Sequence, residues 1–164
     1  VLKKAAAFGM RLLGTDIIDV DPEFVEQVGV EIVDLDTLLK ESDYISVNCD
    51  LNPTSQHLIN ADTLAKMKPT AVLINTARGP IVDEAALIEA LQNGRLAGAG
   101  LDVFEHEPMS TENPLTKMDN VLLAPHNSNS SPTAWENVHW NTIRNLLIGL
   151  ELDADKLDPT KYPA

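Results

Sequence analysis

The alternation of short apolar segments with helix-forming segments is the feature that most restricts how this 164-residue chain can fold. The apolar segments are strand-like and cover residues 11–15, 30–33, 44–48, 71–75, 98–103 and 121–124. Strands that alternate with helices form βαβ units and a mostly parallel sheet, so the sequence predicts an α/β fold. Residues 71–75 and 98–103 are apolar almost throughout, which is typical of strands covered on both faces.

Capping residues mark where the helices begin. The predicted helices and caps are 23–28 after Asp21-Pro22, 37–41 after Asp36, 61–67 after Asn60, 84–92 after Asp83, and 132 to about 150 after Ser131. Asn93-Gly94 predicts a left-handed end to the fourth helix. Residues 1–8 have the pattern of the end of a helix that lacks a cap.

Composition restricts the classes of function. A hydrophobic content of 44% is enough for one packed domain. The net charge of −13 argues against nucleic acid as a partner, because phosphate binding needs a basic surface. No apolar run approaches the ~20 residues of a membrane span, so we expect no membrane partner. Cys49 is the only cysteine, which excludes an intrachain disulfide and fits a cytoplasmic location. No His/Cys cluster has metal-ligand spacing.

Three polar residues follow predicted strands. Arg78 comes after 71–75, Glu107 after 98–103 and His126 after 121–124. Ligands of open α/β sheets bind outside the carboxyl ends of the strands. A guanidinium, a carboxylate and an imidazole at one sheet edge could bind an anion and transfer a proton.

Asp16 ends the first predicted strand, where dinucleotide-binding units carry the carboxylate that holds the adenosine ribose. The glycine fingerprint lies about 20 residues before that carboxylate, which would place it before residue 1. We therefore expect a fold that lacks its first strand and glycine-rich loop. Asp16 alone is equally compatible with an ordinary turn residue.

Several segments, in order, match one family: residues 7–11, 58–60, 73–79, 82–87, 98–105 and 124–126. On these segments the sequence resembles the D-isomer-specific 2-hydroxyacid dehydrogenases, in their phosphoglycerate, glyoxylate and hydroxypyruvate dehydrogenase branch. The resemblance implies a Rossmann-like doubly wound parallel sheet. Residues 1–150 would form the NAD-binding domain, and 151–164 a tail that leads toward a substrate domain. It also implies a homodimer and hydride transfer between NAD(H) and a 2-hydroxy or 2-oxo acid.

The resemblance assigns separate roles to the three strand-end residues. Arg78 would bind the substrate carboxylate and polarise its carbonyl group. His126 would be the proton donor and acceptor, and Glu107 its carboxylate partner. The Glu-Pro pair selects Glu107 over Glu105, and formate dehydrogenases of the same fold place Gln there. His57 is interpreted as a loop residue.

The resemblance also implies a set of cofactor contacts. These are Asp16, Asn48, Cys49, Thr76, Ala77, Arg78, Asp102, His126 and Ser128. Asp16 would repel a 2′-phosphate and so favour NAD over NADP. Asp102 would accept a hydrogen bond from the nicotinamide carboxamide. The alternative role for Asp102 is a structural hydrogen bond to a loop. Asp50 stands where many members have Pro, and residues 127–129 replace a smaller Gly/Ala-rich stretch.

Two other hypotheses stay open. Some relatives of this fold act as NAD(H)-responsive binding proteins, including corepressors, while keeping the same three residues. The 164-residue chain could also be an inactive fragment, and without a phosphate loop we expect it not to bind NAD usefully. The residues do not identify the substrate within the 2-hydroxy acid class.

Overall fold

The computed structural model describes residues 1–127 and 130–152, and it has the predicted α/β fold with parallel strands. All six expected strands are present in the described residues, each one to two residues shorter than its apolar segment. The contacts divide the chain into one unit that ends at His126 and a second that starts at Asn127. The predicted boundary at residue 150 stays a prediction.

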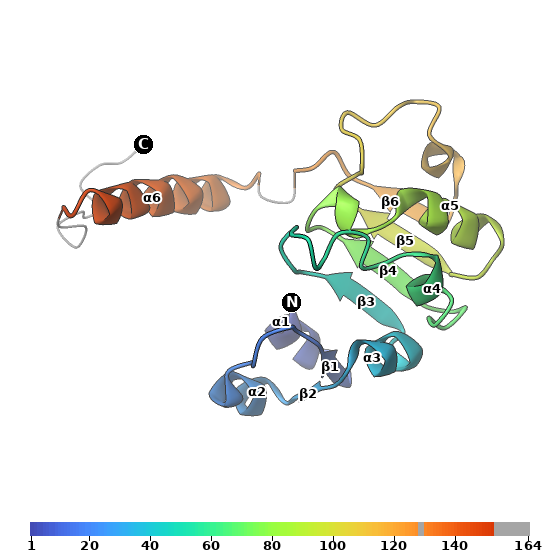
Figure 1. Cartoon of the computed structure of the whole chain (residues 1–164), viewed down its shortest axis with the longest axis horizontal. Helices are drawn as coiled ribbons and strands as arrows, with labels where there is room; N and C mark the ends of the chain where they lie inside the picture. Colours follow the sequence, from blue (N-terminus) through green and yellow to red (C-terminus); the bar gives the residue numbers. More distant parts are fainter. Residues whose placement is uncertain (128–129, 153–164) are drawn as a thin grey trace. The chain divides into compact units, whose positions relative to one another are not determined.

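A four-stranded parallel sheet forms the centre of the first unit (Figure 1). Its strands, in spatial order, are β3 (Tyr44–Val47), β4 (Val72–Asn75), β5 (Gly98–Leu101) and β6 (Val121–Leu123). Asn75 is paired with Leu101, and Leu101 with Leu123, so the last residues of three neighbouring strands lie in one row. The loops that follow these strands therefore start from the same edge of the sheet.

The N-terminal part of the unit contains a separate pair of parallel strands. These elements are α1 (Leu2–Ala6), β1 (Leu12–Gly14), α2 (Pro22–Val28), β2 (Val30–Ile32) and α3 (Leu35–Glu41). Within the described residues β1 pairs only with β2, and β3 only with β4. The expected loss of the first strand and the glycine-rich loop stays a prediction.

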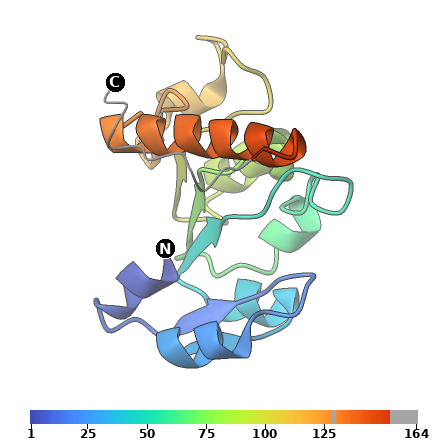
Figure 2. The ribbon, with the colours of Figure 1, turned by 90° about the vertical axis from the view of Figure 1, so that its left-hand side faces the viewer.

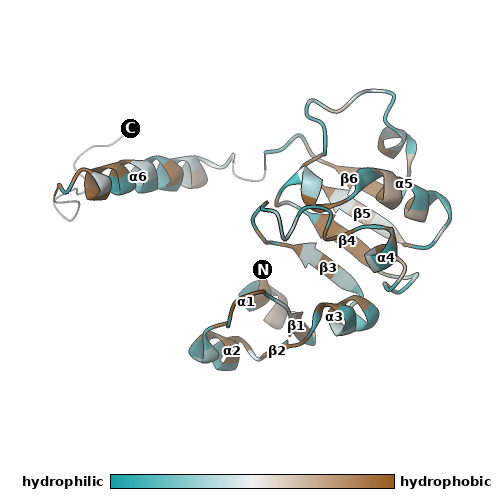
Figure 3. Cartoon of the chain, in the orientation of Figure 1, coloured by the Kyte–Doolittle hydropathy of each residue, from teal (hydrophilic) through white to brown (hydrophobic). Residues whose placement is uncertain are grey.

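Helices α4 (Ala61–Leu64) and α5 (Glu84–Gln92) lie against one face of the four-stranded sheet (Figure 2). The main core there includes Leu73, Leu87 and Leu101. Figure 3 shows brown residues on β4 and on α5, while the loop after β5 is largely teal. On the other face of the sheet, Val72 and Ile74 of β4 are half-buried, whereas Leu122 of β6 is 76% exposed. No residue of β4 or β5 is exposed, and the expectation that both strands are covered on both faces stays a prediction.

Two helix boundaries differ from the predictions. The cap of α3 is Asp34, whose carboxylate accepts from the Thr37 amide, whereas Asp36 lies inside the helix. Helix α4 ends at Leu64 because the next amides, of Lys66 and Met67, bond three residues back instead of four. The other caps are as predicted, and Gly94 has the expected left-handed conformation with φ of 66°.

The second unit contains α6 (Pro132–Gly149), which Ser131 caps through its bond to the Ala134 amide. None of its described residues is buried. The rings of Trp135 and His139 contact each other on this helix, with centroids 5.6 Å apart. Among the helices of the described residues, none combines the length and the apolar composition that a membrane span requires.

Candidate active site

The three strand-end residues follow three adjacent strands of one parallel sheet. Arg78 lies three residues after β4, Glu107 six residues after β5 and His126 three residues after β6. Because β4, β5 and β6 are neighbours in this order, their loops leave the sheet side by side. The fold thus brings the loops that carry these residues to a common edge.

Glu107 and His126 are in direct contact. The distance from His126 Nδ1 to Glu107 Oε2 is 2.7 Å, and Glu107 Oε1 accepts from the Phe104 amide at 2.9 Å. The bond from His126 lowers the pKa of the Glu107 carboxyl, and the Phe104 amide acts in the same direction. An ionised carboxylate only accepts hydrogen bonds, so Nδ1 carries the proton and Nε2 is left for proton exchange.

His126 also has an uncommon backbone conformation. Its φ is 53°, in the left-handed region that few residues other than glycine adopt. Such conformations persist where surrounding contacts hold them, and they are concentrated at functional sites. The Glu107 bond is one contact that orients this imidazole.

Asn75 braces the loop that carries Arg78. The Asn75 side chain is 1% exposed. Its oxygen accepts from the Ala77 amide at 3.0 Å, and its nitrogen donates to the Arg78 carbonyl at 3.0 Å. Both bonds fix the backbone on either side of the Arg78 amide. Arg78 is therefore presented from a rigid turn, although its side chain is exposed.

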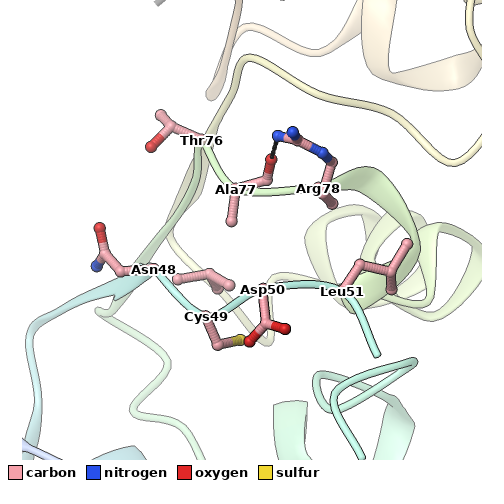
Figure 4. Close-up of a pocket in the computed structure, with 8 residues that line it drawn as sticks. Asn48, Cys49, Asp50, Leu51, Thr76, Ala77 and Arg78 are labelled. Carbon is pink, nitrogen blue, oxygen red and sulfur yellow. Dashed lines mark hydrogen bonds between the residues drawn. The ribbon is translucent and has the colours of Figure 1, made fainter. Parts of the chain in front are cut away.

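An open cleft of about 670 Å³ lies where β3 and β4 end (Figure 4). Its lining includes five of the predicted cofactor contacts, namely Asn48, Cys49, Thr76, Ala77 and Arg78. The guanidinium of Arg78 folds back and donates to the Ala77 carbonyl at 2.6 Å, drawn as a dashed line in Figure 4. That bond uses one of the five N–H donors of the side chain.

Nearby carboxylates influence Cys49, which lines this cleft. Partial desolvation raises the pKa of the Cys49 thiol, and the negative charges of Asp50 and Asp16 raise it further. Cys49 is therefore poorly suited to act as a nucleophile at neutral pH. Asp16 itself is exposed and accepts from the Ile17 amide at 2.7 Å, as a turn residue would. Its predicted contact with a ribose stays a prediction.

Asp102 and Ser128 complete the predicted set. Asp102 directly follows β5, is 4% exposed, and is not among the residues that line the cleft. Its predicted bond to a carboxamide stays a prediction. Ser128 lies outside the described residues. No group of His, Cys, Asp or Glu that could hold a metal ion occurs in the part of the chain that the structure describes.

Sequence reasoning missed three supporting residues. Asn75 was signalled only by being a polar residue at the end of an apolar strand. His57 and Glu105 were interpreted as bystanders, yet His57 Nε2 lies 2.6 Å from Glu105 Oε1. No local sequence pattern predicts this pair, because its two residues are 48 positions apart in the chain.

The parallel sheet and the residues at its edge define a Rossmann-like dinucleotide-binding domain. A family model described as "D-isomer specific 2-hydroxyacid dehydrogenase, NAD binding domain" matches residues 1–128. The chain therefore belongs to this family, as its motifs predicted.

Individual relatives extend the comparison. The chain is 47% identical over 131 residues to a glyoxylate reductase of Korarchaeum cryptofilum, covering 80% of this chain and 39% of the relative. It is 44% identical over 149 residues to a D-3-phosphoglycerate dehydrogenase of Synechocystis, covering 89% and 26% respectively. The solved D-lactate dehydrogenase of Aquifex aeolicus, complexed with NAD and lactic acid, is similar with a TM-score of 0.79 and 33% identity. That match covers 92% of this chain and 49% of the other. The chain thus spans less than half the length of these relatives.

Proposed function

We propose that this chain is the cofactor-binding part of an NAD-dependent oxidoreductase that interconverts a D-2-hydroxy acid and its 2-oxo acid. The observation that carries the proposal is the 2.7 Å contact between His126 and Glu107, on loops adjacent to the one that carries Arg78. Relatives named glyoxylate reductase and D-3-phosphoglycerate dehydrogenase support small 2-oxo acids of this class as substrates.

Arg78 is proposed as the substrate anchor. The bond from the Arg78 guanidinium to the Ala77 carbonyl joins adjacent residues and can be exchanged for a substrate. The forked donors of the guanidinium can then bind a carboxylate. The same positive charge stabilises negative charge that develops on the adjacent carbonyl oxygen during reduction. The bracing of the loop by Asn75 limits the reorganisation that this role requires.

His126 is proposed as the proton donor and acceptor. Glu107 holds the proton on Nδ1, so Nε2 gives a proton to the carbonyl oxygen in reduction and takes it back in oxidation. The lowered pKa of Glu107 keeps its carboxylate ionised across the neutral range, so it remains an acceptor for Nδ1 of His126.

NAD supplies the hydride acceptor and donor at its nicotinamide ring. The cleft after β3 and β4 is large enough for part of such a ligand, and Asn48, Cys49, Thr76 and Ala77 line it. We propose that Asp16 holds the ribose hydroxyls and that Asp102, Arg78, His126 and Ser128 serve the nicotinamide end. We also propose that the whole protein works in the cytoplasm, in keeping with its single cysteine, and that it forms the homodimer that the family resemblance implies.

The test uses the protein expressed from its complete reading frame, with glyoxylate, hydroxypyruvate and 3-phosphohydroxypyruvate as substrates and NADH absorbance as the readout. Arg78→Ala should lower kcat/KM by about 100-fold or more, since a bidentate ionic bond and a charge in the transition state are both lost. Arg95→Ala is the matched control, because Arg95 is an exposed arginine whose ion pair with Glu89 is long, at 3.7 Å. Equal turnover in the parent and Arg78→Ala would overturn the proposal, and negligible turnover of the parent would favour the NAD(H)-responsive binding protein.

A further inference from the structure

We propose that His57 and Glu105 form a second His–Glu pair that positions the loop carrying Glu107 against the loop carrying Arg78. The first of these loops is residues 102–108, here called the β5 loop, and the second is residues 76–82, the β4 loop. The inference rests on the proposed function only in taking these loops as the carriers of the reacting groups. His57 and Glu105 are positioning residues, and neither is proposed to touch a substrate.

His57 is fixed from three directions. Its amide donates to the Pro80 carbonyl in the β4 loop at 2.9 Å. Its own carbonyl accepts from the Asn60 side chain at 3.0 Å, and its ring nitrogen Nε2 contacts Glu105 Oε1 at 2.6 Å. Its φ of 49° is again in the left-handed region, so these contacts hold a conformation that the backbone does not favour by itself. One residue thus bonds to the β4 loop by its main chain and to the β5 loop by its side chain.

Glu105 is held equally firmly on its other side. Its oxygen Oε2 accepts from the Glu84 amide at the start of α5 at 3.3 Å, while its own amide donates to Glu84 Oε2 at 3.2 Å. Glu84 in turn accepts from the Asn113 side chain at 2.7 Å. A carboxylate at a helix start is favoured by the helix dipole. The β5 loop is therefore clamped between α5 and His57.

The contacts of Glu105 with His57 and Glu84, here called the clamp, are connected to Glu107 through the adjacent residue Phe104. Phe104, the neighbour of Glu105, donates its amide to Glu107 Oε1, and Glu107 Oε2 contacts His126. The two loops also meet directly, because a Cβ added to Gly79 would lie 1.8 Å from the Phe104 carbonyl oxygen. Displacement of Glu105 would therefore shift the amide that orients Glu107.

The contact between His57 and Glu105 is important because two carboxylates, those of Glu84 and Glu105, take part in the same set of hydrogen bonds. Each of the two carboxylates of Glu84 and Glu105 accepts from the backbone amide of the other residue, and among the described residues neither has a Lys or Arg within ion-pair distance. The Glu105 side chain is only 24% exposed, so water screens their repulsion incompletely. Loss of the His57 donor leaves a half-buried carboxylate without its closest partner.

The test measures the Glu107 carboxyl by 13C NMR titration of the 164-residue chain, with Glu107→Gln to assign its signal. The wild-type midpoint should lie below the usual 4.5. His57→Leu should raise it by about half a unit or more, because Glu107 loses its alignment with the Phe104 amide and His126. His57→Gln retains a donor for Glu105 and should restore most of the wild-type value. His139→Leu, an exposed histidine on α6, is the matched control and should change nothing.

Glu105→Gln distinguishes two causes of a change in the Glu107 midpoint, namely lost positioning and a changed nearby charge. It also tests the proposal if His57→Leu does not fold. Removal of a negative charge two residues away should by itself lower the midpoint of Glu107. A rise in Glu105→Gln can therefore come only from lost positioning, and that rise is the expected result. An unchanged or lowered midpoint in Glu105→Gln, or an unchanged midpoint in a folded His57→Leu, would overturn the proposal. None of these readouts needs catalytic activity, so the proposed function can fail independently.

Discussion

At Gly79 the β4 loop lies directly against the backbone of Phe104 in the β5 loop. An added methyl group would lie 1.8 Å from the Phe104 carbonyl oxygen and 2.0 Å from its carbon, and backbone atoms cannot rotate away. Gly79→Ala must therefore separate the loops, and we expect it to lower the free energy of unfolding by about 1–3 kcal/mol. Urea denaturation followed by circular dichroism measures this change.

Gly100→Ala is the control for Gly79→Ala. Gly100 lies in β5, and a Cβ there would meet its nearest neighbour, Ile74 Cγ1, at 3.9 Å, which is ordinary contact. The same substitution should be close to neutral at this position. A Gly79→Ala variant as stable as Gly100→Ala would show that the loops can separate without cost.

The pH dependence of stability should report the Glu107 contact. The pKa of Glu107 is lowered in the folded chain, chiefly by the His126 bond. A lowered folded pKa stabilises the fold above the ordinary value of 4.5, and this contribution is lost as pH falls through the folded pKa. Glu107→Gln should therefore narrow the difference in unfolding free energy between pH 7 and about pH 3.5. The effect should be modest, because the side chain is 36% exposed, and an identical difference in both proteins would contradict it.

At the scale of single elements, the capping box of α4 also supports the proposed clamp. Asn60 Oδ1 accepts from the amides of Asp62 and Thr63, and Asn60 Nδ2 donates to the His57 carbonyl. Asn60→Ala should lower the unfolding free energy by about 1 kcal/mol or more, because a cap and a tertiary bond are lost together. Asn60→Asp keeps the capping oxygen and loses only the donor, so thermal denaturation should place it between the wild type and Asn60→Ala. Equal stability of Asn60→Asp and Asn60→Ala would show that the cap contributes nothing.

The elements were predictable where the signal is local. Strand periodicity and the Asp83 and Ser131 caps depend on neighbouring residues, and the structure has them. Asp34 and Asp36 are both plausible caps by residue type, and only the backbone decides that Asp34 reaches the Thr37 amide. The partners of the site were not predictable from spacing, because the bonds of His57 to Glu105 and of His126 to Glu107 join separate loops. Family resemblance singled out Glu107, and its catalytic role stays a prediction.

At the scale of the whole molecule, the first unit has two apolar cores of unequal size. The larger core joins α4, α5 and the four-stranded sheet around fully buried residues such as Leu73 and Leu87. The smaller one contains Leu12, Val28 and Val30 as its buried members. Burial of apolar surface is the main source of stability, and two strands alone are marginal in water. The β1–β2 pair should therefore open more readily than the four-stranded sheet.

Hydrogen exchange of the 164-residue chain measures this difference directly. The amides of β4 and β5 should exchange slowest, while those of β1 and β2 should exchange on the order of tenfold faster or more. Leu73→Ala removes a side chain that is 0% exposed and should lower the stability of the large core by about 2–5 kcal/mol. Val30→Ala should accelerate exchange in β1 and β2 and leave β4 and β5 nearly unchanged, because Val30 belongs to the smaller core. If Val30→Ala instead accelerated amide exchange equally in all six strands, the two cores would unfold as one cooperative unit. Stabilising the N-terminal strands would then also stabilise the sheet edge that carries Arg78, Glu107 and His126.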